Sequence, residues 1–308
     1  MSQAVTSMEI WLPPGTERLR AVDGPARWLG QADPLEAAPA DVQAAVAEGF
    51  GFGGTDEMPV AALLRQHLAG DAGESVWLAA DPAWIQPDMN GARLLACQKM
   101  QLSLADAAAL GRDLQTLFAE HDIELHVDDP DYWQLRLPEG LAAPALTPPS
   151  QAMGADVLAF VPAGAEGRRW RILFNEVQTQ LHGHPLNAQR QASGLPPVNS
   201  LWFWGGGRLP SRQRSRWQGV ISDDPVLLAA AAAAGLTAGE RVPATLEGLR
   251  GPWLVDLQTL DGESLYPWLA VLARLGRRRP LQWRLADGRR WQQRPWHRWR
   301  FWRSAWTA

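Results

Sequence analysis

Residues 173–210 read LFNEVQTQLHGHPLNAQRQASGLPPVNSLWFWGGGRLP, and no other stretch of the chain is so dense in histidine, asparagine, proline, tryptophan and glycine. The pattern predicts a helix over Leu173–His182, with Asn175 as a possible N-cap. Pro185 ends that helix, because the residue before a proline is pushed out of the α region. Asn187–Ala192 is then expected to form a second short helix, closed by the glycine that follows it.

The second half of the stretch predicts a buried strand that runs into a glycine loop. Leu201–Trp204 is apolar and aromatic throughout, which is typical of a buried strand. Three glycines follow, and they allow a backbone to approach a ligand closely. Since Arg208 comes directly after them, this end of the strand is a sensible place to hold an anion.

The polar residues of the stretch form a candidate ligand site. An arginine can bind phosphate or carboxylate through a planar fork of donors. The predicted ligand-binding residues are His184, Asn187, Arg190, Asn199, Gly205, Gly206, Gly207 and Arg208. A structural alternative stays open: the two asparagines could cap turns, and the histidine could satisfy a buried backbone carbonyl.

The spacing of these residues resembles a known family. The run H-P-x-N-x-x-R-x-x-x-G-x-x-P-x-N-x-x-W-x-W-G-x-G is similar to the archaeal-type cofactor-independent phosphoglycerate mutases of the alkaline phosphatase superfamily. It resembles still more closely a proteobacterial group described either as RpfE-type regulatory proteins or as phosphoglycerate mutases. The matching positions are His184, Pro185, Asn187, Arg190, Gly194, Pro197, Asn199, Trp202, Trp204, Gly205 and Gly207.

The resemblance implies a fold and a domain arrangement. Strands alternate with helices along the chain, which by itself indicates an α/β class. The family adds an alkaline phosphatase-like layered α/β core interrupted by an inserted smaller α/β domain. We therefore expect a core from residues 1–85 and 211–275, an insert from 86–210, and a basic, tryptophan-rich hairpin and helix from 276–308.

The enzymes of this family are expected to need two divalent metals, Mn or Zn, and a serine nucleophile. Two such ions would polarise the phosphate and activate the nucleophile. No histidine lies between His184 and His297, although the family places metal-binding histidines there. Only weak counterparts of the other site residues occur: Asp23-Gly24, Thr55-Asp56, Asp256 and Asp261. We therefore expect no metal site, and a site for two divalent ions, Mn or Zn, is the alternative.

Composition indicates a cytoplasmic protein. A single cysteine, Cys97, excludes an internal disulfide and fits a reducing compartment. The first residues have neither the basic segment nor the apolar segment of a secretory signal, and no apolar run has the length of a membrane span. P-loop, H-E-x-x-H and G-x-S-x-G motifs are all absent from the 308 residues.

The C-terminal segment is the most basic part of the chain. Residues 274–303 hold eleven arginines against one acid, whereas the rest has 18 basic and 32 acidic residues. A hairpin is predicted at 280–294, turning at Asp287-Gly288. The next four tryptophans, Trp296, Trp299, Trp302 and Trp306, share one face of a predicted helix.

Three interpretations of that helix are open. It can pack on the core or a second copy, bind single-stranded nucleic acid by stacking and charge, or lie on a membrane surface. Burial is favoured, because four exposed tryptophans would forgo roughly several kcal/mol each. We expect a non-catalytic regulatory protein with an anion pocket; an active mutase or phosphohydrolase, or a nucleic-acid-binding protein acting through 276–308, is the alternative. A small anion and a homo-oligomer are possible partners.

Overall fold

The computed structural model describes residues 7–14, 16, 25–52, 57–89, 91–160, 164 and 166–303. The chain divides into two compact units. Met1–Phe52 and Arg212–Ala308 form a discontinuous unit, and Gly53–Ser211 forms an inserted unit between them. Layered α/β organisation with an inserted α/β unit is thus confirmed, but the insert begins well before residue 86 and is no smaller than the unit it interrupts.

The discontinuous unit is built on a seven-stranded sheet of order β2-β12-β11-β1-β10-β8-β9. Its strands are β1 (Met8–Trp11), β2 (Asp33–Leu35), β8 (Gly219–Ile221), β9 (Thr237–Ala238), β10 (Trp253–Asp256), β11 (Leu281–Arg284) and β12 (Arg290–Gln293). Strands β11, β1, β10, β8 and β9 run parallel, whereas β12 pairs antiparallel with both β11 and the edge strand β2.

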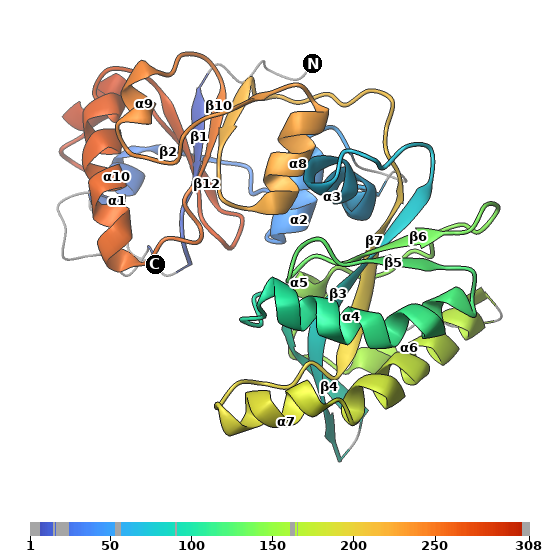
Figure 1. Ribbon diagram of the computed structural model, residues 1–308. Coiled ribbons are helices and arrows are strands. Elements are labelled where there is room, and N and C mark those ends of the chain that lie inside the picture. Colours follow the sequence, from blue (N-terminus) through green and yellow to red (C-terminus); the bar gives the residue numbers. More distant parts are fainter. Residues whose placement is uncertain are drawn as a thin grey trace. The chain divides into compact units, whose positions relative to one another are not determined.

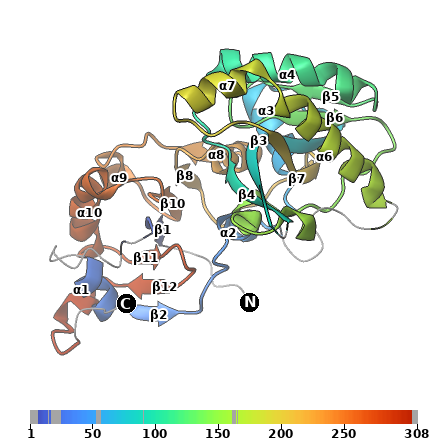
Figure 2. The same cartoon turned by 90° about the horizontal axis from the view of Figure 1, so that it is seen from below.

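Helices cover both faces of this sheet (Figure 1). The helices are α1 (Pro25–Gln31), α2 (Val42–Gly49), α8 (Pro225–Ala233), α9 (Thr245–Gly248), α10 (Gly262–Gly276) and the 3₁₀ helix η3 (Pro295–Trp299). The apolar core lies between the sheet and α1, α9 and α10, where Ile10, Val255 and Trp283 meet Leu269 and Leu272. Helices α2 and α8 lie on the other side of the sheet (Figures 1 and 2).

The inserted unit is organised around one long strand. Its strands are β3 (Val76–Asp88), β4 (Gly91–Cys97), β5 (Glu124–His126), β6 (Gln134–Leu137) and β7 (Ser200–Arg208). Strand β3 pairs with β4, β6 and β7, always antiparallel. Because β3 continues without a break through residue 85, a domain boundary there is wrong.

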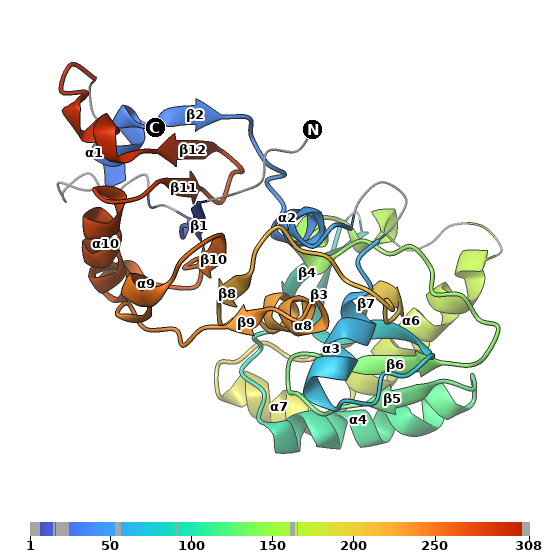
Figure 3. The same ribbon diagram turned by 90° about the horizontal axis from the view of Figure 1, so that it is seen from above.

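Helices pack on the sheet of the inserted unit. They are α3 (Val60–Leu68), α4 (Leu104–Ala119), α5 (Pro149–Ala152), the 3₁₀ helix η2 (Val157–Ala159), α6 (Glu166–His182) and α7 (Pro185–Ala192). Helices α4 and α6 contact each other, and α3 packs on β3 and β7 (Figure 3). No helix in the described ranges is long and apolar enough to cross a membrane.

The motif helix is longer than the sequence indicated. Helix α6 starts at Glu166, so Asn175 lies in its interior and caps nothing. Trp170, Leu173, Val177 and Leu181 are all buried, at the spacing of one helical face. This periodicity extends the helix back through residues preceding Leu173.

The glycine triplet does not form a loop. Strand β7 runs through it to Arg208, paired along β3. Two glycines have positive backbone angles, with φ of +60° at Gly205 and +149° at Gly207, and the pairing with β3 shifts register opposite them. The glycines therefore allow a bulge within a continuous strand.

The hairpin at 280–294 is confirmed as β11 and β12, with Gly288 at φ +85° in its turn. The prediction of a helix that carries Trp296, Trp299, Trp302 and Trp306 on one face is wrong. In the described part of this segment, which ends at Arg303, only Pro295–Trp299 is helical, and it is a 3₁₀ helix. Trp296, Trp299 and Trp302 are 59%, 63% and 70% exposed. Trp306 lies outside the described residues.

Candidate functional site

The polar residues of the motif hold backbone segments of the inserted unit together. His184 caps α7, because its Nδ1 accepts a hydrogen bond of 3.1 Å from the Leu186 amide. Its Nε2 lies 3.3 Å from Oδ2 of Asp113 on α4. The histidine thus fixes the start of one helix against the side of another.

Asn187 and Arg190 are buried on α7 and bind main-chain groups. Asn187 donates to the carbonyls of Leu181 and Val198, both at 2.9 Å, and its Oδ1 accepts from the Val198 amide at 2.8 Å. Arg190 donates from Nε to the Pro196 carbonyl at 2.9 Å and from Nη2 to the Met100 carbonyl at 2.6 Å. The hydrogen bonds of both side chains therefore go to main-chain groups of the inserted unit.

Asn199 also binds main-chain groups, in this case those of Ile85 on β3. It accepts from the Ile85 amide at 2.9 Å and donates to the Ile85 carbonyl at 2.7 Å. The pairing of β3 with β4 shifts register between Trp84 and Ile85, so the asparagine replaces ladder bonds at an irregular position.

The structure does not bring the predicted ligand residues into one pocket. Arg208 donates to the Glu74 carbonyl at the far end of the nine-residue strand β7. Nine residues of strand span roughly 26–30 Å, so Arg208 is far from the histidine and asparagines that precede Ser200. The space beside the triplet glycines is filled by protein: a Cβ on Gly205 would lie 2.8 Å from Cβ of Val60.

A fully buried carboxyl group completes this structural cluster. Asp81 on β3 accepts hydrogen bonds from Trp204 Nε1 at 2.6 Å, Gln98 Nε2 at 2.7 Å and the Trp133 amide at 3.3 Å. Burial nevertheless raises the pKa of Asp81 to about 7, against these three donors, which favour the charged form. Trp204 of the motif is therefore a hydrogen-bond donor inside the core.

Polar residues also gather at the carboxyl ends of the parallel strands in the discontinuous unit. This edge is where open parallel sheets commonly bind ligands. Ser222, just after β8, donates to Oδ2 of the buried Asp256 at 2.8 Å, and the Gln258 amide donates to Oδ1 at 3.1 Å. Burial raises the pKa of Asp256, and both of its carboxyl oxygens are already bonded to protein donors.

Asp256 belongs to a row of side chains across this edge. Trp11 pairs in register with Asp256 on one side and with Arg284 on the other, so the three residues share one face of the sheet. The guanidinium of Arg284 lies over the Trp11 ring, 4.5 Å from its centroid. Glu9, on the same face, accepts from Arg216 and from Trp217.

Arg284 is the most unusual residue of the row. It is 1% exposed, and its Nη2 donates to the Pro39 carbonyl at 2.8 Å. Its Nε and Nη1 are buried without a hydrogen-bond partner among the described residues. Buried polar groups are normally hydrogen-bonded, so these two donor groups are an exception within the described part of the chain. Burial lowers the pKa of Arg284, and the negative charge of Glu9 opposes that shift. The sequence signal was a charged residue in a strand whose other residues include the apolar Leu281 and Trp283.

The described residues do not form the metal site that the family resemblance implies. They contain no group of three or more His, Cys, Asp or Glu side chains placed to hold an ion. Asp261 accepts from the Ser264 amide at 2.9 Å and caps α10. Asp23-Gly24 and Thr55-Asp56 lie outside the described residues.

Comparison with known proteins places part of this chain beside phosphoglycerate mutases. No family model matches it. The 2,3-bisphosphoglycerate-independent phosphoglycerate mutase of Methanothrix thermoacetophila is 34% identical over 68 residues, which are 22% of this chain and 17% of that protein. A probable enzyme of the same description from Geobacter sulfurreducens is 34% identical over 71 residues, 23% of this chain and 18% of that protein. The matches span less than a fifth of these relatives' length.

Two solved structures show a distant likeness over most of the chain. A cofactor-independent phosphoglycerate mutase from Thermoplasma acidophilum has a TM-score of 0.43 and 12% identity, covering 94% of this chain and 89% of that one. A protein from Pyrococcus horikoshii has a TM-score of 0.47 and 12% identity, covering 94% and 87%.

The raised pKa of Asp81 predicts a pH-dependent stability. The folded protein retains a proton that the unfolded chain releases, because an aspartate in the unfolded chain has its ordinary pKa of 3.8. The stabilisation is therefore complete below pH about 4 and is lost as pH rises through about 7. Urea unfolding at pH 5 and 8 should show wild type losing about 2–3 kcal/mol more than Asp81→Asn over that interval, since one pKa unit is about 1.4 kcal/mol. Equal losses in both proteins would contradict the buried, protonatable carboxyl.

Proposed function

We propose that this protein is related to the phosphoglycerate mutases but binds a small anion without interconverting phosphoglycerates. Its role would be regulatory, as in the RpfE-type group that the motif resembles. The observation that carries the proposal is Arg284, a buried guanidinium at the carboxyl end of a parallel sheet, two of whose nitrogens have no hydrogen-bond partner among the described residues. A phosphate or carboxylate oxygen is the natural acceptor for such donors.

The positions that resemble the family's metal ligands support a non-catalytic protein. Both carboxyl oxygens of Asp256 accept hydrogen bonds, from Ser222 and Gln258, and Asp261 is used as a helix cap. Both carboxylates thus have a role in the fold, as a buried acceptor and as a helix cap. Absence of a bound cofactor, a location in the cytoplasm and a homo-oligomeric state all remain predictions.

The alternative is an active phosphoglycerate mutase or phosphohydrolase with two Mn or Zn ions. The descriptions of the partial relatives favour it. The described residues fit such ions poorly, because they do not bring three ligand side chains together.

An assay coupled to 2-phosphoglycerate consumption decides between these two functions. We expect no interconversion of 3- and 2-phosphoglycerate by the full chain, with or without added Mn²⁺. Turnover that disappears in Asp256→Ala or Asp261→Ala would overturn the non-catalytic proposal. Metal content of the purified protein provides an independent check, because two tightly bound ions would favour the enzyme.

Anion binding at Arg284 is tested by substitution with methionine. Met fills the space over Trp11 without charge, but it gives up the hydrogen bond to the Pro39 carbonyl, so the response of each protein to anions is compared with its own stability in their absence. We expect inorganic phosphate and 3-phosphoglycerate to stabilise wild type, by about 2.7 kcal/mol at a hundredfold excess over Kd. The variant should lose that stabilisation.

Arg208→Met is the matched control, because Arg208 belongs to the site expected from the sequence and lies in the inserted unit. It should retain the response to both anions. Loss of the response in Arg208→Met, or an equal response in Arg284→Met, would refute the assignment to Arg284.

A further inference from the structure

The segment after β12 exposes an unusual amount of aromatic surface. Trp296, Trp299, Phe301 and Trp302 are 59%, 63%, 79% and 70% exposed, and we call these four side chains the aromatic tip. Large apolar side chains are rarely exposed together unless they contact a partner or a membrane. The sequence had favoured their burial, so the aromatic tip requires a different explanation.

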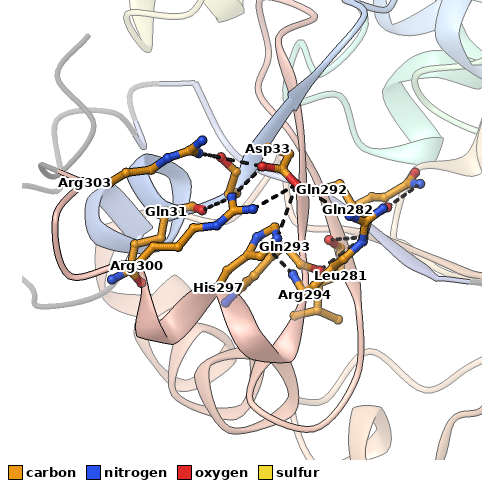
Figure 4. A network of polar contacts seen from close by, with 11 residues as sticks. Gln31, Asp33, Leu281, Gln282, Gln292, Gln293, Arg294, His297, Arg300 and Arg303 are labelled. Atoms are coloured by element: carbon orange, nitrogen blue, oxygen red, sulfur yellow. Dashed lines mark hydrogen bonds and ion pairs between the residues drawn. The ribbon is translucent and has the colours of Figure 1, made fainter.

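The segment is folded so that its polar side is anchored and its aromatic side is free. Residues three apart share one side of a 3₁₀ helix. Arg294, His297, Arg300 and Arg303 follow that spacing and all approach Asp33, with Arg300 Nη1 2.5 Å from Oδ1 and His297 Nε2 3.3 Å from Oδ2 (Figure 4). Trp296, Trp299 and Trp302 follow the same spacing on another side.

Buried contacts and backbone hydrogen bonds define the anchor. His297 is 1% exposed, and Arg300 and Arg303 also donate to the carbonyls of Gln31 and Ala32, both at 2.9 Å. The hydrogen bond from Arg300, together with the positive charges of His297, Arg300 and Arg303, lowers the pKa of Asp33. The contacts with Asp33 hold the polar side of the segment against the protein. The aromatic tip, on the other side, is therefore exposed.

Positive charge surrounds the aromatic tip. The guanidinium of Arg294 lies 5.6 Å from the ring centroid of Trp296, and that of Arg298 lies 5.1 Å from the centroid of Trp299. The sequence contains no acidic residue from Gly288 to Ala308. The partner that this surface fits is both apolar and anionic.

We propose that the aromatic tip docks on a phospholipid surface that contains anionic lipid. Tryptophan favours the membrane interface, where its ring is buried among lipid and its N–H meets polar groups. Arg298 beside Trp299 then faces lipid phosphates, and Arg294, whose Nη1 lies 3.6 Å from Asp33, adds positive charge next to Trp296. This association is peripheral and is independent of whether the protein binds or converts phosphoglycerate.

Two other partners fit the surface less well. Single-stranded nucleic acid needs a track of available cations along its backbone, but Arg290 and Arg300 near the tip are bonded to the Glu36 carbonyl and to Asp33. A second copy would meet a like-charged surface in a symmetric contact. Four side chains of roughly 150–250 Å² each, partly exposed, also fall short of the roughly 800 Å² per partner of a stable interface.

Sedimentation with vesicles tests the proposal directly. The full chain should co-sediment with vesicles of phosphatidylcholine and phosphatidylglycerol, and about tenfold less with phosphatidylcholine alone, since the arginines need lipid phosphates of net negative charge. The double variant Trp299→Ala, Trp302→Ala should lose binding to the anionic vesicles by about tenfold or more, because most of the buried apolar area is removed. Its melting temperature should equal that of wild type, since both rings are exposed.

Tyr266→Ala is the matched control, because Tyr266 is an aromatic residue 42% exposed on α10. It should bind vesicles as wild type does. The proposal is overturned if wild type does not sediment with anionic vesicles or if the double variant binds them equally well. It is also overturned if those two tryptophans are instead required for binding a single-stranded oligonucleotide, or for self-association in sedimentation velocity.

Discussion

The inserted unit depends on buried side chains that hydrogen-bond to main-chain groups. Asn187 joins the end of α6 to the segment before β7, Arg190 reaches the Met100 carbonyl, and Asn199 pairs with the backbone of Ile85. Each contact satisfies a backbone group in an irregular segment, where leaving it unpaired would cost roughly 1–3 kcal/mol. The motif is thus explained by the fold of this unit, and a ligand is not needed to account for its residue types.

The surfaces that we propose to be functional belong to the discontinuous unit. Its parallel strands place Asp256, Trp11 and Arg284 in one row, and its antiparallel edge brings Asp33 to the segment that carries the aromatic tip. In both places the fold holds an arginine beside a tryptophan. In the row, the guanidinium of Arg284 is buried, and two of its nitrogens lack partners among the described residues. At the tip, the guanidinium of Arg298 lies beside the exposed ring of Trp299.

Sequence reasoning succeeded where local chemistry decides the structure. The Asp287-Gly288 turn and the α/β class both depend on short-range signals. It failed where long-range contacts decide. The role of Arg190 depends on a carbonyl 90 positions away, and the tryptophan spacing of three fits an α-helix as well as the 3₁₀ segment that Asp33 selects. Arg284 was missed because a sequence does not show that a buried arginine has nitrogens without hydrogen-bond partners among the described residues.

Hydrogen exchange of the full chain, with and without 3-phosphoglycerate, measures most directly where this protein meets its ligand. The account predicts slower exchange at backbone amides near the carboxyl ends of β8, β10 and β11, around Ser222, Gln258 and Leu285, with no change across residues 184–208. Protection confined to residues 184–208 would contradict it, since the motif would then be the ligand site and its hydrogen bonds to the backbone would be secondary.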